Sequence, residues 1–356
     1  MAMSSAIPIP TDSPDLIRIP VEQMVSVVEQ ILVKKSLFQF DATVAAQRLV
    51  EADLYGIPSH GCGRIRELVS AIDCGDVDPR ARVLIVDEND VLSVLDGGRA
   101  LGHLAATKGV EAAIAKAKSS GVGISCIGNS QTLGALSVPL RMASENGLIA
   151  IGFSSTGGAT VAAPGMTTGV VGNAAFAYVI PRKDLPPIVF DSACGVESWG
   201  KLNLLKRFGV SMPNDFAFDS EGQPTSDIDA AATLMPLGGE LGFGLSFLGS
   251  ILAGPLVGGQ MAIRKKGTDS SDDSQHFVIV LDIGHFTEAD RFHKRIDVAV
   301  EEMKEKAKEG DREFRIPGER GADCFHEYST TGIPLHRSIL EEIKQLAQSL
   351  NVDDSF

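Results

Sequence analysis

The order of helical and strand-like patterns limits the folds open to this chain more than any other feature of the sequence. Apolar residues at helical spacing cover residues 21–54, with a break at 36–40, and then 62–72, 104–119, 135–146, 236–255, 291–310 and 336–350. Strand-like segments cover residues 83–94, 122–127, 148–154, 170–180, 188–191 and 278–286. The polar segment 265–275 predicts an exposed loop. Because strands and helices alternate irregularly, the sequence predicts a mixed α+β fold instead of a regular doubly wound sheet.

The composition narrows the classes of partner. The chain has 356 residues, of which 44% are hydrophobic, so it can bury one large core or a few smaller ones. A formal net charge of −14 repels phosphate backbones and anionic lipids, which argues against nucleic acid and membrane surfaces as partners. A small anionic substrate therefore needs a local positive pocket.

Targeting and cysteine patterns point to the cytoplasm. Residues 1–15 contain proline, serine and acidic residues and do not resemble a secretory signal. No window approaches the apolar length that spans a bilayer. The five cysteines are odd in number and form no CxxC pair, which predicts reduced cytoplasmic thiols and no metal site. They are Cys62, Cys74, Cys126, Cys194 and Cys324.

The most specific local cluster of chemical groups is the segment Ser59–Arg64. Ser59 can cap a helix, and the spacing of four residues would place His60 and Arg64 on one helical face. Arginine can hold a carboxylate with two hydrogen bonds while histidine gives a proton to, or takes it from, the adjacent oxygen. Taken alone, a histidine and an arginine four residues apart are common, and a packed histidine with a solvated arginine is the preferred interpretation. His103, at the start of an Ala-rich helix, is expected to be structural or solvent-facing.

A longer series of motifs resembles one family. Residues 51–64 read Glu-Ala-Asp-Leu-Tyr-Gly-Ile-Pro-Ser-His-Gly-Cys-Gly-Arg and resemble the entry motif of the malate/L-lactate dehydrogenase family. That family also includes ureidoglycolate, sulfolactate, diketogulonate and cyclic-ketimine reductases. Similar segments follow in order at 96–98, 121–123, 129–130, 187–191, 200–201, 219–227, 237–239, 316–320 and 332–335. The resemblance spans most of the chain, far more than one chance motif would cover.

The resemblance implies a malate/L-lactate dehydrogenase-like fold that is not a Rossmann fold. It implies a helical domain from both termini (residues 16–80 and 287–356), a central, largely antiparallel sheet domain (81–286) and a disordered tail (1–15). It also implies a homodimer that uses NAD(P)H. The chain has no GxGxxG after an early strand, as expected for a fold that is not a Rossmann fold. The absence of this fingerprint therefore does not exclude a dinucleotide.

The resemblance also assigns roles to single residues. His60, Arg64 and Ser59 would contact the substrate, and Asp191 would lie near the imidazole as its charged partner. A buried aspartate beside a histidine raises the basicity of the ring and fixes its tautomer. From the residues alone, the preferred interpretation of Asp191 is a cap or turn residue at the end of a strand.

Several positions depart from the family pattern. Where the family has Asn-Ser-x-His-x-Gly, with a catalytic histidine, residues 129–134 place Thr132, whose hydroxyl can bind a carbonyl but does not readily exchange a proton. The positions expected to contact the cofactor are Thr156, Gly157, Gly158, Gly172, Asn173 and Leu241, the last in place of a lysine. Each hydrogen bond to a charged group that is lost removes about 1.5–3 kcal/mol. The changes are consistent with a weakened or lost dinucleotide site, and also with a site that uses backbone groups.

These observations leave two main hypotheses for function. The first is a nicotinamide-dependent oxidoreductase for a small 2-oxo, 2-hydroxy or cyclic imino carboxylic acid. The alternative is a redox-independent isomerase, lyase or cyclase that reuses the pocket of His60, Asp191 and Arg64, because proton transfer needs only an acid/base group and a carboxylate anchor. Retention of these three residues disfavours a non-catalytic binding protein.

Overall fold

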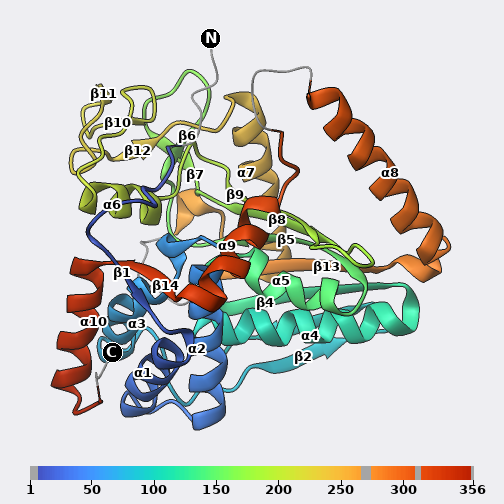
Figure 1. Ribbon diagram of the computed structural model, residues 1–356, viewed down its shortest axis with the longest axis horizontal. Helices are drawn as coiled ribbons and strands as arrows, with labels where there is room; N and C mark the ends of the chain where they lie inside the picture. Colours follow the sequence, from blue (N-terminus) through green and yellow to red (C-terminus); the bar gives the residue numbers. More distant parts are fainter. Residues whose placement is uncertain (1–6, 266–273, 309–313, 354–356) are drawn as a thin grey trace.

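A seven-stranded sheet forms the centre of the computed structural model, which describes residues 7–265, 274–308 and 314–353 (Figure 1). The strand order is β2-β3-β4-β13-β5-β8-β9. In that order the strands are Leu84–Glu88, Leu92–Asp96, Val122–Ser130, Ser274–Asp282, Leu148–Ser155, Ala175–Ile180 and Ile188–Ala193. Strands β3 and β4 are parallel, and the other neighbouring pairs are antiparallel. The prediction of a mixed α+β, largely antiparallel and non-Rossmann fold is therefore confirmed.

Helices cover both faces of this sheet. Helices α4 (Gly102–Ser120) and α5 (Ser137–Glu145) pack on one face, and α7 (Glu240–Leu252) packs on the other. Helix α4 approaches β4 closely at Gly109, where an added Cβ would lie 2.2 Å from the Cδ1 atom of Ile127. The small residue thus lets the helix backbone approach the sheet.

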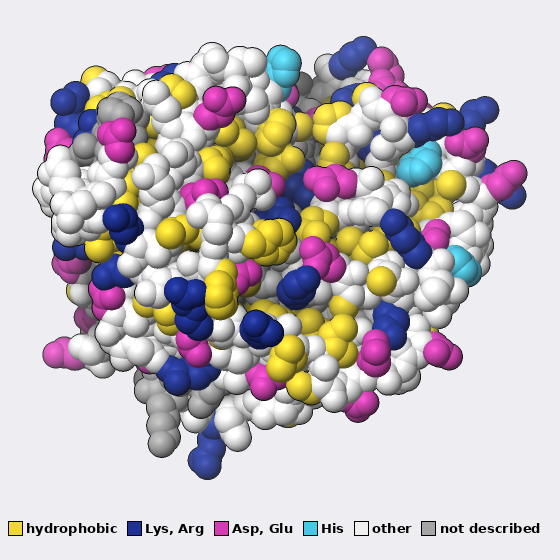
Figure 2. Space-filling view, turned by 90° about the horizontal axis from the view of Figure 1, so that it is seen from below, with side chains coloured by type: hydrophobic (Ala, Val, Ile, Leu, Met, Phe, Trp, Pro, Cys, Tyr) yellow, Lys and Arg dark blue, Asp and Glu magenta, His cyan; other side chains and the backbone are white. Residues whose placement is uncertain are grey.

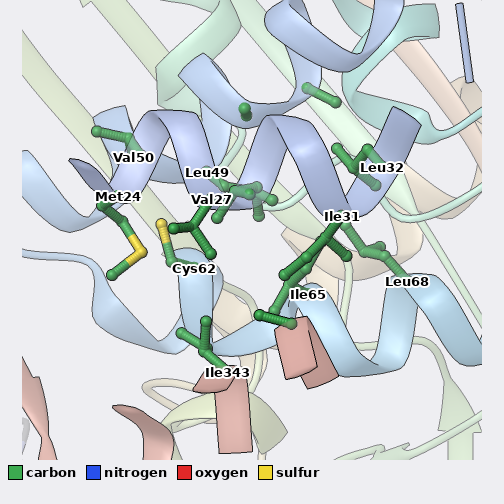
Figure 3. Close-up of a cluster of buried hydrophobic side chains, with 14 of the residues drawn as sticks. Met24, Val27, Ile31, Leu32, Leu49, Val50, Cys62, Ile65, Leu68 and Ile343 are labelled. Carbon is green, nitrogen blue, oxygen red and sulfur yellow. The ribbon is translucent and has the colours of Figure 1, made fainter. Parts of the chain in front are cut away.

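The two ends of the chain build a second, helical core. It contains α1 (Val21–Lys34), α2 (Gln39–Leu54), α3 (Ile65–Asp73) and α10 (Arg337–Ser349), beside the antiparallel strands β1 (Leu16–Ile19) and β14 (Ile333–His336). Figure 3 shows Met24 and Ile31 of α1, Leu49 of α2 and Ile343 of α10 in this core, where each is at most 1% exposed. The helical pattern from both termini thus buries one shared apolar surface.

A third, smaller unit contains a five-stranded sheet with the order β11-β10-β12-β6-β7. Its short strands, in that order, are Pro224–Thr225, Ala217–Phe218, Thr233–Leu234, Val161–Ala162 and Gly169–Val171, and α6 (Trp199–Arg207) packs beside them. The single strand predicted at 170–180 is wrong. Strand β7 pairs with β6, whereas β8 pairs with β5, so the chain changes sheets near Gly172.

Other predicted segments also differ in the structure. Helix α9 (Glu319–Thr331) lies between the two C-terminal helical segments that the sequence predicts, and α8 (Ala289–Ala307) lies far from α1, α2 and α10 in Figure 1. Ile9, in the expected disordered tail, packs against the helical core, while residues 1–6 lie outside the described part.

The expected exposed loop at 265–275 is buried at both ends. The Nζ atom of Lys265 donates to the Ser155 carbonyl at 3.1 Å and to the Gln275 Oε1 atom at 2.8 Å. Gln275 belongs to β13 and is 2% exposed. Residues 266–273 of this expected loop lie outside the described residues.

The expectation that no segment approaches membrane-spanning length also needs correction. The segment Glu240–Val257 is apolar enough by composition, with a mean hydropathy of 1.5 over 18 residues, one third of them buried. The helix itself ends at Leu252 after 13 residues. It spans about 20 Å, against about 30 Å for the hydrocarbon layer of a bilayer.

Candidate active site

The segment Ser59–Arg64 forms two short 3-10 turns instead of the expected capped helix. They are η1 (Pro58–His60) and η2 (Cys62–Arg64), and they meet at Gly61, whose backbone is extended (φ −91°, ψ −153°). The extended residue interrupts the helical path, so Ser59 caps nothing. Its Oγ atom lies 3.0 Å from the Nδ1 atom of His60 instead.

Two adjoining cavities meet at His60. The first, called the Arg64 cavity, has a volume of about 770 Å³, and the second, called the Asp191 cavity, has a volume of about 390 Å³. Their shared wall includes His60, Asn173 and Ser198. The Arg64 cavity is also lined by Arg64, Thr132, Thr156, Gly157 and Gly158, and the Asp191 cavity by Ser59 and Asp191. Most of the residues singled out in the sequence thus line one continuous region.

The environment of His60 favours the neutral imidazole. Burial, and to a smaller extent the nearby charge of Arg64, lower the pKa of His60 from 6.5 to about 4. The expected rise in basicity is therefore not seen in the ligand-free chain. A neutral imidazole is ready to accept a proton, and an anion bound to Arg64 would cancel one cause of the lowered pKa.

Arg64 forms an ion pair with Glu67, and the arginine side chain is 33% exposed. Both residues line the Arg64 cavity. Because the pair is accessible, a substrate carboxylate could displace Glu67 and take up the planar guanidinium with two hydrogen bonds.

Asp191 lies at the wall of its cavity and also supports a helix. Its Oδ2 atom accepts a hydrogen bond from the backbone N–H of Ser137, the first residue of α5, at 2.7 Å. Burial raises the pKa of Asp191, while the Ser137 hydrogen bond and the charge of Arg141 lower it. Both side chains are described, and no hydrogen bond or ion pair joins Asp191 to His60. The structure thus shows a cap at α5, and a charge pairing with the imidazole stays a prediction.

The residues expected to contact a cofactor divide into two groups. Thr156, Gly157 and Gly158 follow β5 and line the Arg64 cavity, and an added Cβ on Gly158 would meet only the Lys265 carbonyl, at 3.8 Å. Asn173 lines both cavities, where its side chain donates to the Glu197 carbonyl and accepts from the Gly195 N–H. The backbone at 157–158 is therefore open to a ligand.

Two of the expected cofactor residues lie elsewhere. The Gly172 carbonyl accepts a hydrogen bond from Ser246 of α7 at 2.6 Å, and Gly172 lines neither cavity. Leu241 is 63% exposed on α7 and lines neither cavity. Helix α7 turns this position outward, and a contact of Leu241 with a cofactor stays a prediction.

Several lining residues were not predicted as site residues, although Lys201 belongs to the segment 200–201 that resembles the family. Helix α6 begins between the two cavities, where Ser198 caps it by accepting the Lys201 N–H at 3.2 Å. Trp199 lines the Arg64 cavity, and Lys201 lines the Asp191 cavity while paired with Glu197 at 2.6 Å. The signal that could have found them is the Ser198 N-cap before an apolar helix.

The arrangement fits a dinucleotide without a Rossmann motif. The open backbone at Gly158 and the N-terminus of α6 both suit anionic groups such as phosphates or carboxylates. The two cavity volumes fall within the usual range of about 300–1,000 Å³ for ligand sites. Across residues 7–265, 274–308 and 314–353, no group of three or more His, Cys, Asp or Glu side chains is arranged to hold a metal ion.

Of the two environments expected for His103, the structure shows the structural one. It is 4% exposed and lies behind Gly134, where an added Cβ would be 2.9 Å from the His103 Nε2 atom. Burial lowers the pKa of His103 to about 4, with a smaller contribution from His60. It is therefore an interior residue near the site and does not face solvent.

Comparison with known proteins agrees with this architecture. The family model for malate/L-lactate dehydrogenase matches residues 19–344. The malate dehydrogenase of Pyrococcus horikoshii is 33% identical over 350 residues, which cover 95% of this chain and 96% of that protein. The malate/(S)-sulfolactate dehydrogenase of Methanothermus fervidus is 32% identical, with 93% and 98% covered.

A solved structure extends the match to three dimensions. The structure of malate dehydrogenase from Pyrococcus horikoshii superposes with a TM-score of 0.85 at 30% identity and covers 96% of this chain and 97% of that chain. Sequence, fold and the joint placement of His60 and Arg64 at one cavity lead to the same conclusion. The chain belongs to the malate/L-lactate dehydrogenase family.

Proposed function

We propose that the protein is an NAD(P)-dependent oxidoreductase that acts on a small 2-oxo or 2-hydroxy carboxylic acid, or on a cyclic imino acid. The observation that carries this proposal is the meeting of His60, Arg64, Thr132 and the open backbone of Gly158 at one cavity. The names of the relatives, which act on malate and sulfolactate, point to the same class of substrate.

Arg64, His60 and Thr132 have separate roles at the cavity in this proposal. Arg64 releases Glu67 and holds the substrate carboxylate, which places the neighbouring oxygen or nitrogen beside His60. In the reductive direction His60 must first take up a proton, which the substrate carboxylate favours by offsetting the charge of Arg64, and the imidazolium then gives that proton to the neighbouring atom. In the oxidative direction the neutral ring takes the proton from that atom. The Thr132 hydroxyl donates a hydrogen bond to the carbonyl oxygen.

The dinucleotide lies in the Arg64 cavity in this proposal. Thr156 and the backbone of Gly157 and Gly158 hold it, with the N-terminus of α6 near its anionic groups. When bound, it supplies or accepts the hydride at the carbon whose oxygen or nitrogen faces His60. Trp199 lines the same cavity and shields the reacting carbon from water.

One observation favours the redox-independent alternative. Thr132 lies at the cavity where the family pattern has a histidine, so the chain has lost one acid/base group of the hydride-transfer chemistry. An isomerase, lyase or cyclase would still have His60 for proton transfer and Arg64 as an anchor. Such an enzyme would turn over its substrate at the same rate with and without added dinucleotide.

The single tryptophan of the chain provides the test. Because Trp199 lines the Arg64 cavity, bound NADPH or NADH should quench its fluorescence by energy transfer. Oxaloacetate, sulfopyruvate and pyrroline-2-carboxylate are then offered with the bound dinucleotide, and absorbance follows its oxidation. Saturable quenching with turnover that His60→Ala abolishes supports the proposal. No quenching by either dinucleotide at millimolar concentration contradicts it.

We further propose that the chain forms a homodimer. Leu241, Phe247, Leu248 and Ile251 are exposed on α7 at spacings of three, four and seven residues, so they form one apolar stripe. On the face seen in Figure 2, by contrast, small apolar groups are separated by charged side chains. A second copy of the chain covers the α7 stripe in this proposal.

Light scattering tests the dimer. The wild-type chain should show twice the mass of one chain, and Leu248→Glu should shift it to one chain mass without changing its circular dichroism spectrum. A wild-type mass of one chain would overturn the proposed dimer. The exposed Glu111→Gln substitution on α4 is the matched control.

A further inference from the structure

A buried carboxyl group lies directly behind the turn that carries His60 and Arg64. Asp53, near the end of α2, is 2% exposed, and its Oδ2 atom accepts the backbone N–H of Cys62 at 2.7 Å. Cys62 is the residue midway between His60 and Arg64 in the sequence. The carboxyl group therefore holds the joint between η1 and η2.

The joint is shaped to admit this carboxyl group. An added Cβ on Gly61 would lie 2.0 Å from Oδ1 and 2.4 Å from Oδ2 of Asp53, distances that no real side chain tolerates. The Gly61 carbonyl in turn accepts the Arg64 N–H at 3.0 Å. The main chain thus passes over the carboxyl group with no room for a side chain, and the next hydrogen bond along the chain positions Arg64.

The other end of the joint is anchored in the helical core. Figure 3 shows the Cys62 side chain beside Val27 and Leu49, and Cys62 is fully buried. The Asp53 carbonyl also accepts the Gly56 N–H at 2.9 Å, so both the side chain and the main chain of this residue shape the loop after α2. Asp53 therefore contacts the loop that carries His60 and Arg64 through both its side chain and its main chain.

Burying this carboxyl group lowers the free energy of unfolding. Its Oδ1 atom has no hydrogen-bond partner among the described residues, and Asp53 forms no ion pair there. Burial raises the pKa of Asp53 to about 7, against the Cys62 N–H and thiol, which lower it. An apolar residue would avoid this desolvation, so stability alone does not account for an aspartate at this position.

We propose that Asp53 is a positioning residue, whose carboxyl group sets the Gly61–Cys62 joint and thereby the relative placement of His60 and Arg64 at the substrate cavity. This role rests on the proposed function for its effect on turnover. Its effect on the loop itself can be measured without any substrate. Asp53 does not line the Arg64 or the Asp191 cavity, so it acts through the turn and not by touching the ligand.

Two variants of Asp53 separate the charge of the carboxyl group from its role as a hydrogen-bond acceptor, and a third variant is the control. Asp53→Asn keeps an acceptor oxygen for the Cys62 N–H, Asp53→Ala removes it, and Glu51→Gln is the control. Glu51 lies on the same helix, but its carboxyl group pairs with Arg48 at 2.6 Å and does not touch the turn.

Hydrogen exchange measures the loop directly. Losing a charge-assisted hydrogen bond of about 1.5–3 kcal/mol predicts that the Cys62 amide exchanges about 10- to 100-fold faster in Asp53→Ala. Asp53→Asn should stay within about threefold of wild type for the same reason, because its amide oxygen still accepts. Peptides from β4 and β5 should not change in either variant. Equal exchange at residues 57–64 in wild type and Asp53→Ala would overturn the proposal.

Kinetics provide the second readout. With NADPH and oxaloacetate, Asp53→Ala should raise KM for oxaloacetate about tenfold or more, while the dissociation constant of NADPH from Trp199 quenching stays within about twofold. Asp53→Asn should restore most of the affinity for oxaloacetate. Equal losses in NADPH binding and KM would indicate a general structural defect and would overturn the positioning role. If the wild-type enzyme neither binds NADPH nor turns over, the proposed function fails, and hydrogen exchange alone decides the role of Asp53.

Discussion

Acid should destabilise this protein through three buried imidazoles. His103 is 4% exposed, and His276 is fully buried, with its ring nitrogens facing the Ser154 hydroxyl at 2.9 Å and the Gln131 carbonyl at 3.2 Å. Together with His60, these rings have pKa values lowered, mainly by burial, to about 4 for His60 and His103 and about 3 for His276. Their unfolded-state pKa is 6.5, so the unfolded chain binds the protons first. Above pH 6.5 the rings are neutral in both states and do not reduce the free energy of unfolding. As the pH falls toward 4, protonation of the unfolded chain lowers this free energy.

The magnitude follows from the pKa shifts. At pH 5 each ring favours the unfolded chain by about 2 kcal/mol, or about 6 kcal/mol for all three, since one pKa unit corresponds to about 1.4 kcal/mol. Asp53 acts in the opposite direction, because its pKa is raised from 3.8 to about 7 and it binds a proton more readily in the folded chain. Between pH 7 and pH 5 protonation of Asp53 raises the free energy of unfolding by about 2 kcal/mol. Among these four groups the histidines outweigh Asp53, and their net loss of about 4 kcal/mol is large beside a typical stability of about 5–15 kcal/mol. The raised pKa of Asp191 and of Glu51 acts in the same direction as that of Asp53 and reduces the loss.

Urea unfolding at pH 7 and pH 5, followed by Trp199 fluorescence and circular dichroism, measures this loss. In His103→Gln, which does not titrate, the difference between the two pH values should shrink by about 2 kcal/mol. Any direct effect of the substitution on packing appears at both pH values and cancels in the difference. His326→Gln, at an exposed position of α9, is the control and should keep the wild-type difference. The reasoning is refuted if His103→Gln loses as much stability as wild type between pH 7 and pH 5.

Three further predictions concern the site and the core. Thr132→His should raise kcat with NADPH and oxaloacetate by about 10²- to 10⁴-fold, because it returns an acid/base group to the Arg64 cavity; an unchanged kcat in a folded variant contradicts the proposed role of this position. Arg64→Lys should raise KM for oxaloacetate by about 10- to 100-fold, because an ammonium cannot form the paired hydrogen bonds of a guanidinium; an unchanged KM means that the carboxylate binds elsewhere. Leu49→Ala, at a fully buried position of α2, should reduce the free energy of unfolding by about 2–5 kcal/mol in urea denaturation, and a loss below 1 kcal/mol would mean that the core collapses around the cavity.

Much of the site followed from residue identity and spacing. The motif at residues 51–64 led to His60 and Arg64, and both line the same cavity although the helix expected between them is absent. Thr132 and Gly158 were found through their departures from the family pattern and line that cavity too. Leu241 followed from the same reasoning and lies outside it, because motif position does not tell which way a helix turns its residues.

Buried polar groups were the hardest to anticipate. His103 was expected to be structural or facing solvent, and Asp53 was named only as part of the motif at residues 51–64, without a role of its own. Their importance comes from burial, which arises when segments far apart in the chain pack together. His276 and Gln131, for example, are 145 residues apart and in contact. No local pattern carries that information.

The sequence by itself determined most helices of the two termini, most strands of the central sheet and the family, because periodicity and motif spacing depend on residues within a few turns of one another. Tertiary structure alone decided that the 170–180 segment divides between two sheets, that Asp191 caps α5, and that a carboxyl group is shut in behind the His60–Arg64 turn. The physical reason is the same in each case. Hydrogen-bond partners and desolvation are set by which distant surfaces meet, and those contacts exist only once the cores have formed.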